Sequence, residues 1–406
     1  AAARAEYHRV PKPFDVFLGR FGMTPDLDAL HPFGHLLTPA FAPVRFDTQF
    51  FIAPVPPNQE PHVERGELVR GQWITPAEAL ARWERNAMKV PPPTLAMLKA
   101  LARFGPQEAA QILNATDGKP HHERFRIEVH PGIYVEPLPT RTLPPATTTN
   151  CYFVVGQKDV VIIDPAAETQ EGIAVLDYHL AGLAKEGKKV TAILLTHHHS
   201  DHVGAVRWLK DRTGAPVMAH SETAERLPKG LVDDWMEDGD TVKLGKYGPT
   251  GAAWTLKAIH TPGHAPGHLA FLDSRWNAVI GGDLVSAVST ILIDPDDDGD
   301  MGAYLDSLER ILELDPPILL PSHGAAITDP VGKLEEYREH RLMREGKVLH
   351  AVQSGHRTVD AMLPVAYDDT DPSLYGLALQ SLRAHLAKLE DEGRVAQKNG
   401  TYEFLG

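Results

Sequence analysis

The sequence predicts an α/β fold whose strands end in polar clusters. The apolar run from Val190 to Leu195 has the length and composition of a buried strand, and a helix-patterned stretch from Val203 to Lys210 follows it closely. Three further apolar stretches end near Ile259, Ile280 and Leu320, and glycine or proline follows each of them. Strands and helices that alternate in this way are typical of α/β proteins.

The first of these strands opens onto a cluster of ligand-type residues, His197-His198-His199-Ser200-Asp201-His202. Imidazoles and carboxylates brought together without a cation lose hydration and gain little, so the cluster predicts a metal site. On extended backbone His197 and His199 leave on one side, whereas His198 leaves on the other and faces solvent or supports a ligand. A tight bend at Asp201 and His202 would aim both side chains at a second ion.

The other strand ends supply further candidate ligands. Pro262-Gly263 forces a turn that presents His264, and His323 follows in a turn after Leu320. Between them, Asp283 follows two glycines that let backbone approach closely. Four such clusters in sequence order predict a site built from strand ends. Histidines that only pack, or that hold one ion without turnover, remain the alternative.

With these motifs, residues 124–324 resemble the metallo-beta-lactamase superfamily, whose pattern is HxHxDH, a later histidine, a bridging aspartate and a last histidine. The resemblance implies an αββα sandwich with the site at one edge of two packed sheets, and residues 150–155 and 160–164 as early strands of the first sheet. It also implies seven metal ligands, with His197, His199 and His264 on one ion, Asp201, His202 and His323 on the other, and Asp283 shared. No cysteine replaces this aspartate, unlike in the beta-lactamases that use a cysteine ligand.

Two divalent cations roughly 3.5 to 4 Å apart can hold a hydroxide near neutral pH and polarise a scissile group, so hydrolysis is the predicted reaction class. The nitrogen and oxygen ligands suit zinc, with manganese or iron as alternatives. We take Asp201 and His268 as candidate catalytic residues. His268 could meet a phosphate oxygen or protonate a leaving alkoxide, and the alternative is a histidine that only orients a ligand.

The C-terminal segment predicts a winged helix. Helical periodicity covers residues 334–351, 358–363 and 375–392. Gly393 would end the last helix, and Asn399-Gly400 would form the turn of a small hairpin. Three helices followed by a hairpin make up the winged-helix pattern.

Two motifs in this tail, Glu339–Glu345 and His385–Gly393, resemble the beta-lactamase-like endoribonucleases, whose animal members act on single-stranded RNA in mitochondria. The tail carries more acidic than basic side chains, so it lacks the basic footprint of an autonomous nucleic-acid reader. We therefore expect it to pack or to form a homodimer, and to contribute a wall of the substrate cleft.

These resemblances rank the substrates. Phosphodiester cleavage in single-stranded RNA comes first, and hydrolysis of a small-molecule ester, thioester or lactone comes second. Beta-lactam hydrolysis, as a weak promiscuous activity, comes third. A metal-holding binding or scaffold protein stays open as a different class.

The first 120 residues are rich in proline and resemble the C-terminal half of Nudix hydrolases. Arg45–Phe51 matches a strand of that family, and Trp73–Leu80 matches the start of its closing helix. The acidic Nudix signature that binds magnesium is missing from the sequence, so diphosphate hydrolysis is not expected. Asp47, Glu64 and Glu67 could be remnants of a site, but solvated surface acids are the preferred interpretation. Truncation and a natural half-fold both stay open as explanations.

Length and composition predict three parts in a reducing compartment. The 406 residues allow a partial Nudix-like α+β segment over 1–120, a metallo-beta-lactamase catalytic domain over 121–330 and a winged-helix domain over 331–406. The single cysteine, Cys151, excludes an internal disulfide. Because no stretch has transmembrane length and no signal-peptide pattern is present, we expect a cytoplasmic protein without membrane contact. The net charge of -14 is evenly spread, which argues against generic attraction to nucleic acid.

Two smaller features have ordinary explanations. The acidic stretch from Asp294 to Asp300 resembles a calcium-binding loop, but Leu305 stands where such a loop needs glutamate. We favour a helix start, with Asp300 capping a helix over residues 301–314. His220 follows a strand, and because nothing else in the sequence pairs with it we expect a structural histidine.

Overall fold

The chain folds into two units in the computed structural model, one comprising residues 1–38 and 45–121 and the other residues 39–44 and 122–406. The structure describes residues 14–38, 45–57, 60, 63, 68–85, 87–114, 127–247 and 251–406. Among these residues, no helix combines the length and the apolar character needed to cross a membrane.

The first unit pairs a short hairpin with helices. Its elements are α2 (Phe14–Arg20), η1 (Leu27–Ala29), β1 (His31–Leu37), β2 (Asp47–Ile52), α3 (Pro76–Glu84) and α4 (Pro92–Asn114). β1 and β2 are antiparallel, and Phe33 and Leu36 of β1 pack against Met97 and Leu113 of α4. β2 and α3 coincide with the predicted strand and helix, whereas the Nudix assignment stays a prediction.

The suggested remnants of a Nudix site are only partly visible. Asp47 is largely exposed and contacts the ring of His35, as a solvated surface acid would. Glu64 and Glu67 lie outside the described residues.

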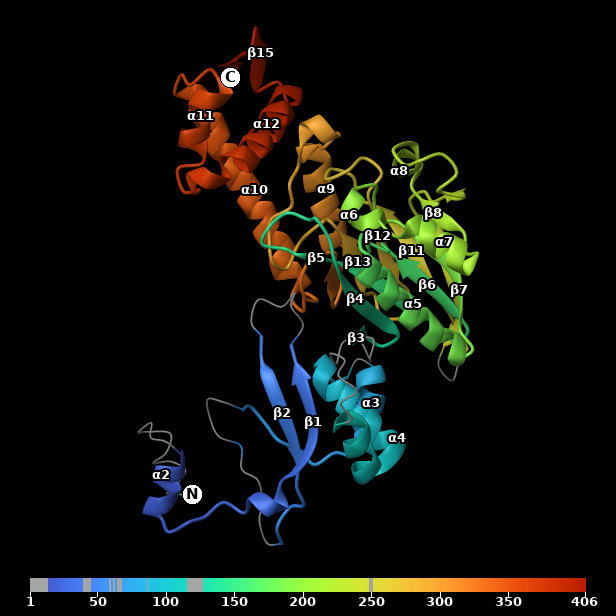
Figure 1. Cartoon of the computed structure of the whole chain (residues 1–406). Helices are drawn as coiled ribbons and strands as arrows, with labels where there is room; N and C mark the ends of the chain where they lie inside the picture. The colour runs from blue at the N-terminus through green and yellow to red at the C-terminus, as the bar shows by residue number, and fades with distance from the viewer. Residues whose placement is uncertain are drawn as a thin grey trace. The chain divides into compact units, whose positions relative to one another are not determined.

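The second unit is built around two sheets (Figure 1). Within the described ranges the larger sheet has seven strands in sequence order, β3 (Ile127–His130), β4 (Ile133–Pro139), β5 (Thr148–Val155), β6 (Asp159–Ile163), β7 (Lys189–Leu194), β8 (Val217–Ala219) and β9 (Asp234–Trp235). The smaller sheet has five described strands, also in sequence order, β10 (Thr241–Tyr247), β11 (Ala252–His260), β12 (Leu269–Asp273), β13 (Val279–Gly282) and β14 (Leu319–Pro321). β5 and β6 coincide with the early strands that the family resemblance implies.

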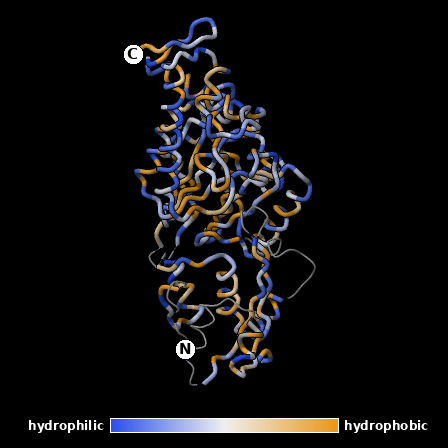
Figure 2. The backbone as a smooth tube through the Cα atoms, turned by 90° about the vertical axis from the view of Figure 1, so that its left-hand side faces the viewer, coloured by the Kyte–Doolittle hydropathy of each residue, from blue (hydrophilic) through white to orange (hydrophobic). Residues whose placement is uncertain are grey.

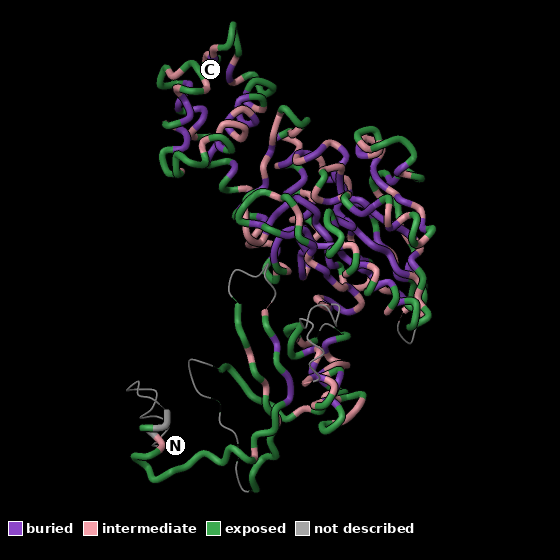
Figure 3. Tube along the Cα trace, in the orientation of Figure 1, coloured by how far each residue is buried: buried purple, intermediate pink, exposed green. Residues whose placement is uncertain are grey.

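Alternating side chains on these strands create layers. Phe153 of β5 and Ile162 of β6 face α5 (Gln170–Lys185) and α7 (Val206–Thr213), whereas their neighbours Val154 and Val161 face the smaller sheet. The far face of the smaller sheet packs against α9 (Met301–Leu312) and the start of α10 (Pro330–Gln353). This is an αββα sandwich, and the buried strands run through its middle (Figure 3). Hydrophobic and hydrophilic residues alternate along the chain, as two-faced strands and helices require (Figure 2).

The helix expected over residues 203–210 begins later than predicted, and a separate turn precedes it. α6 (Ser200–Val203) is a single turn, and α7 begins only at Val206. Glycine is needed at the break, because a Cβ atom added at Gly204 would lie 2.7 Å from the carbonyl oxygen of Ala167. The Ala205 amide donates to the Pro165 carbonyl at 2.8 Å, which holds the chain in this bend.

The C-terminal segment is a winged helix, as predicted. Its helices are α10, α11 (Val359–Ala366) and α12 (Tyr375–Asp391), with η4 (Pro372–Leu374) before α12, and β15 (Val395–Lys398) and β16 (Thr401–Phe404) form the hairpin. α10 belongs to two cores, since Leu334 and Tyr337 pack on the sandwich and Val348 and Val352 pack on α11 and α12. The sandwich and the winged helix are therefore joined by one continuous helix.

Candidate metal centre

The ends of four strands meet at one edge of the sandwich. His197 follows β7, His264 follows β11, Asp283 follows β13 and His323 follows β14. The predicted ligands gather there in groups whose ligand atoms lie within 4.8 Å of one another. One group, which we call the outer triad, is His197, His199 and His264, and another, the inner triad, is Asp201, His202 and His323.

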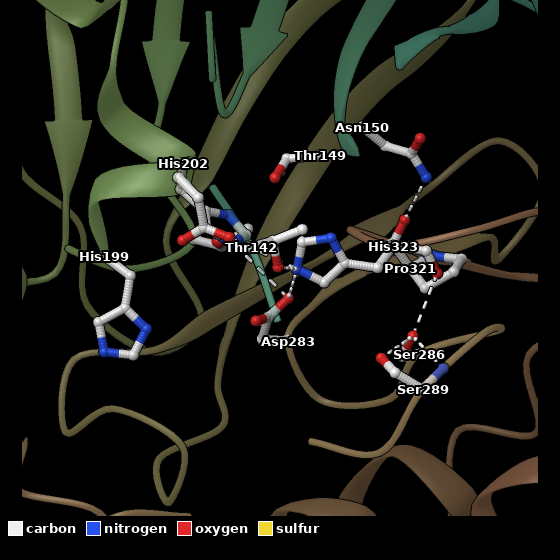
Figure 4. A network of polar contacts seen from close by, with 12 residues as sticks. Thr142, Thr149, Asn150, His199, His202, Asp283, Ser286, Ser289, Pro321 and His323 are labelled. Carbon is white, nitrogen blue, oxygen red and sulfur yellow. Dashed lines mark hydrogen bonds and ion pairs between the residues drawn. The ribbon is translucent and has the colours of Figure 1, made fainter. Parts of the chain in front are cut away.

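Asp283 lies between the two triads. Its Oδ2 atom is 3.4 Å from His264 Nε2 in the outer triad. Its Oδ1 atom is 3.6 Å from His202 Nε2 and 3.3 Å from His323 Nε2 in the inner triad. Figure 4 shows the Asp283 carboxylate against the His323 ring, with His202 and His199 on its other side. This is the position that a shared ligand would need.

The donor atoms fit a pair of divalent cations. His202 Nε2, His264 Nε2 and Asp283 Oδ1 are buried and have no hydrogen-bond partner. Buried polar atoms are normally paired, so atoms that converge without pairing indicate a missing partner that accepts lone pairs. Imidazole nitrogens and carboxylate oxygens are ligands that zinc, manganese and iron accept. The side chains therefore fit divalent ions without selecting one of them.

The inner triad is held by groups inside the sandwich. His202 Nδ1 lies 2.8 Å from Asp164 Oδ2, and Asp164 also accepts hydrogen bonds from the Thr196 amide at 2.8 Å and hydroxyl at 2.6 Å. His323 Nδ1 lies 2.9 Å from the Thr148 carbonyl oxygen of β5. With each Nδ1–H donated in this way, both rings turn Nε2 toward Asp283.

The outer triad is held by a loop of the smaller sheet. His264 Nδ1 lies 2.8 Å from the Leu292 carbonyl oxygen, and His199 Nε2 lies 3.0 Å from Asp297 Oδ2. His199 therefore turns its Nδ1 atom inward, where it is 2.9 Å from His197 Nε2. His197 and His199 bring their ligand atoms together, as the alternation of extended backbone predicts, whereas a ring nitrogen of His198 lies within 4.8 Å of ligand atoms of His199 and Asp297 instead.

The pKa values of the histidines also differ between the two triads. Burial, and then the neighbouring His202, His199 and His264, lower the pKa of His197 well below its usual value. At His202 burial acts in the same direction, but Asp201 and Asp283 outweigh it and raise the pKa well above its usual value. Neutral imidazoles next to ionised carboxylates are the protonation states that metal binding requires, although protons must leave His202 when an ion enters.

His268 occupies a buried position behind Asp283. Its Nδ1 atom lies 2.8 Å from Thr261 Oγ1, and its Nε2 atom accepts a hydrogen bond from the Asp283 amide at 3.0 Å. Burial lowers its pKa to about 3. Because both ring nitrogens are engaged and the side chain is 1% exposed, the geometry favours the orienting role over proton donation to a leaving group. His268 holds the backbone of Asp283.

Two glycines allow these close approaches. Gly282 has φ +55°, and a Cβ atom there would lie 2.4 Å from His268 Nε2. Gly263 has φ +130°, and a Cβ atom there would lie 2.3 Å from Tyr304 Cα of α9. The turn that presents His264 and the strand end that presents Asp283 therefore both depend on glycine.

His220, which was expected to lack a partner, has several. Its Nε2 atom lies 3.0 Å from Glu237 Oε2, and its ring stacks on His260 at 4.2 Å with an interplanar angle of 7°. Ligand atoms of His220, Glu222 and His260 lie within 4.8 Å of one another. Parallel stacked rings direct their lone pairs side by side rather than toward a common ion, so we retain the structural interpretation.

Sequence patterns missed two supporting residues. Asp164 follows β6, and an acid at the end of an apolar strand was the signal that could have found it. Asp297 belongs to the acidic loop, where Asp300 caps α9 as predicted and accepts a hydrogen bond from the Ala303 amide. The contact between Asp297 and His199 joins residues 98 positions apart, and no local pattern encodes it.

Known families match two parts of the chain. Residues 144–323 match the metallo-beta-lactamase superfamily, and residues 358–402 match the beta-lactamase associated winged helix domain. The beta-lactamase-like protein 2 homolog of Drosophila melanogaster is 30% identical over 277 residues, which are 63% of this chain and 87% of the fly protein. The atrochrysone carboxyl ACP thioesterase of Aspergillus chevalieri is 30% identical over 229 residues, 56% of this chain and 68% of the fungal protein.

Solved structures share the fold. A beta-lactamase domain protein from Burkholderia ambifaria has a TM-score of 0.60 at 20% sequence identity, with 71% of this chain and 96% of that chain covered. A metallo-beta-lactamase family protein from Thermus thermophilus has a TM-score of 0.55 at 23% identity, with 68% and 100% covered. At these identities the likeness supports the architecture alone.

Proposed function

The chain belongs to the metallo-beta-lactamase superfamily, and from this premise we propose that it is a metallohydrolase with two ions, held by the inner triad, the outer triad and Asp283. One observation carries the proposal. One unpaired, buried ring nitrogen from each triad, His202 Nε2 and His264 Nε2, faces an oxygen of the same Asp283 carboxylate, at 3.6 and 3.4 Å. A structural cluster of histidines would use these atoms in hydrogen bonds.

The side chains define the parts of the reaction that the protein itself supplies. Two bound divalent ions would lower the pKa of water and offset negative charge that develops on the substrate. Asp201 is 15% exposed and its Oδ2 atom lies 3.7 Å from His323 Nε2, so its carboxylate is available both to an ion and to a substrate-side proton. His268 holds the Asp283 backbone and keeps its carboxylate between the triads.

For the substrate, we place a thioester or ester first. Asp297, whose side chain is 60% exposed, brings a carboxylate to the solvent side of the outer triad. Arg226 is paired with the adjacent Asp298, so its charge is largely offset. A polyanion approaching this side would meet repulsion, whereas a neutral carbonyl would not. The thioesterase among the relatives supports the same class.

Single-stranded RNA remains the second candidate. It was predicted from His268 and from the tail motifs, and both features have structural explanations here. His268 is buried behind Asp283, and Arg341 and Arg344 of the first motif are buried at 3% and 5% exposure. The match to the beta-lactamase associated winged helix domain keeps this candidate open, since that module is a second place where a substrate could bind.

Metal analysis and a substrate panel test the proposal. We expect about two zinc ions per chain after loading and dialysis, and hydrolysis of a model acyl thioester that exceeds hydrolysis of bis-p-nitrophenyl phosphate. Asp201→Ala should lower the thioesterase rate by at least about 1,000-fold, because it removes an ion ligand and a proton-handling group. Asp211→Ala, the same substitution at an exposed acid of α7, is the matched control.

The outcomes separate the candidates. Turnover of phosphodiesters but not of thioesters would replace our first substrate by the second. A wild-type protein that binds no zinc and turns over no substrate of either class would overturn the metallohydrolase itself.

A further inference from the structure

The loop that supports the outer triad begins directly after Asp283. We call residues Leu284–Asp298, which run from the end of β13 toward α9, the support loop. It contains the short helix η3 (Pro295–Asp297). Two of its groups touch metal-ligand candidates, the Leu292 carbonyl oxygen at His264 and the Asp297 carboxylate at His199. The loop thus sets the orientation of two rings of the outer triad.

The last helix of the winged-helix module, α12, binds the support loop near its C-terminal end. The Arg383 guanidinium of α12 contacts both carboxylate oxygens of Asp296, one of them at 2.7 Å. Gln380, one turn earlier on α12, donates from Nε2 to Asp294 Oδ2 at 2.6 Å. A bidentate pair fixes direction as well as distance, so Asp296 has little freedom to rotate.

The first helix of the module, α10, donates hydrogen bonds to the middle of the support loop. Arg341 of α10 is 3% exposed, and it donates to the Ile291 carbonyl and, at 3.2 Å, to Thr290 Oγ1. Tyr337, one turn earlier, donates to the Ser289 carbonyl at 2.5 Å. These groups hold the backbone immediately before Leu292.

The loop residues that the module binds are next in sequence to the loop residues that contact the outer triad. Arg341 holds Ile291, and the next carbonyl, that of Leu292, accepts the His264 proton. Arg383 holds Asp296, and the next side chain, that of Asp297, reaches His199. An exposed histidine–carboxylate pair such as His199 and Asp297 is weakly ordered on its own, because solvent competes for both partners.

We propose that the winged-helix module acts as a clamp that positions the outer triad, with Arg383 and Asp297 as positioning residues for His199. This inference rests on the proposed metal centre. The carboxylate of Asp297 accepts the Nε2 proton of His199 and thereby leaves Nδ1 as the ligand atom that faces His197. The module thus contributes to the centre without touching an ion or a substrate.

Metal affinity and a spectroscopic signature test the clamp in the full-length protein. Each variant is loaded with Zn²⁺ for competition against a chromophoric chelator, and with Co²⁺ for its visible absorption spectrum. Loss of an outer-shell partner typically costs 10- to 100-fold in metal affinity. Asp297→Asn should therefore weaken one of the two ions by about 10-fold and shift the Co²⁺ bands.

The Arg383 variants test whether the module acts through Asp297. Arg383→Gln should weaken the same ion by about threefold to 10-fold, and Arg383→Lys should restore part of the loss. The double variant Arg383→Gln/Asp297→Asn should be no weaker than Asp297→Asn alone. Arg357→Gln, which removes an ion pair with Glu403 within the same module, is the matched control and should behave like wild type.

The results distinguish failure of the clamp from failure of the proposed metallohydrolase function. A wild-type protein that binds no ion overturns the proposed function. A wild-type protein with two ions, together with Arg383→Gln at wild-type affinity and with an unchanged Co²⁺ spectrum, overturns the clamp alone. Additive losses in the double variant also overturn it, because Arg383 would then act by another route.

Discussion

The two triads of the candidate metal centre differ in what holds them. In the inner triad the side chains of His202 and its partner Asp164 are 0% and 2% exposed, and they follow two neighbouring strands of the larger sheet, Asp164 after β6 and His202 on α6 after β7. In the outer triad His199 is 21% exposed and its partner Asp297 is 60% exposed. The sandwich core alone can therefore order the inner triad. The outer triad also depends on a surface loop and on the module docked against it.

This difference explains why a winged helix of acidic composition can matter for a hydrolase. Four polar side chains of α10 and α12 donate hydrogen bonds to the support loop, namely those of Tyr337, Arg341, Gln380 and Arg383. A nucleic-acid reader would instead present such groups to solvent. The expected packing role of the module agrees with these contacts, whereas its role in dimerisation stays a prediction.

Removal of the ions should have the largest effect on the free energy of unfolding, and this effect should differ between the regions that hold the two triads. An ion that binds only the native state adds about 4 kcal/mol to the free energy of unfolding when its free concentration is about 1,000-fold above Kd. Two ions therefore add about 8 kcal/mol, which chelation should remove in urea unfolding experiments.

Hydrogen exchange of the chelated protein can locate this loss. The support loop should lose more protection than β5 and β6, and zinc added back should restore it. Equal loss of protection in the loop and in these strands would contradict the comparison of the triads.

Asp164→Asn should disable the inner triad selectively. The Asp164 carboxylate accepts from the Thr196 amide, from its hydroxyl and from His202, all within a fully buried region. An asparagine would direct an amide donor at these donors, so we expect a loss of about 3 kcal/mol in the free energy of unfolding. One ion should also bind about 10- to 100-fold more weakly, measured by chelator competition.

Asp211→Asn at the surface of α7 is the control for this substitution. Unchanged zinc affinity in Asp164→Asn would mean that the buried carboxylate supports the fold but not the centre.

Gly282→Ala should disturb the aspartate shared by the triads. Alanine at φ +55° is strained, and its Cβ atom would lie 2.4 Å from His268 Nε2. We expect a loss of about 2 to 3 kcal/mol in thermal or urea unfolding, together with weaker binding of both ions. Gly393→Ala is a matched control, because its φ of +70° is equally strained while nothing lies within 4 Å of the added atom. Similar behaviour of the two variants would show that strain, rather than the contact with His268, decides the outcome.

The sequence predicted the ligands of this centre better than the contacts that support them. The seven candidate ligands follow strands, so short patterns of apolar residues, glycine and histidine place them. The contact between Arg383 and Asp296 spans 87 positions and arises only when α12 docks on the loop. The break between α6 and α7 is accompanied in the same way by a hydrogen bond from the Ala205 amide to the Pro165 carbonyl, 40 positions away. Tertiary packing decides such features, and local periodicity does not contain them.

The smallest expected effect concerns His385 of α12, one of the two helices that hold the support loop of the outer triad. The residue is fully buried, and burial followed by the charges of Arg341 and Lys388 lowers its pKa to about 3. In the unfolded chain the pKa of a histidine is about 6.5. The unfolded state therefore binds a proton that the native state does not, and stability falls as the pH falls below 6.5.

The size of this pH effect follows from the two pKa values. Between pH 7.5 and pH 5.5 the contribution of His385 to the free energy of unfolding should fall by about 1.4 kcal/mol. His385→Leu removes the titrating group, so urea unfolding of the metal-free variant should lose about 1.4 kcal/mol less over this range than metal-free wild type. Because α10 and α12 hold the support loop, hydrogen exchange at pH 5.5 should rise in that loop before it rises in β5 or β6. Identical pH dependence of unfolding in the two proteins would show that His385 does not bind an additional proton on unfolding, and an unchanged order of exchange would show that its protonation does not couple to the clamp.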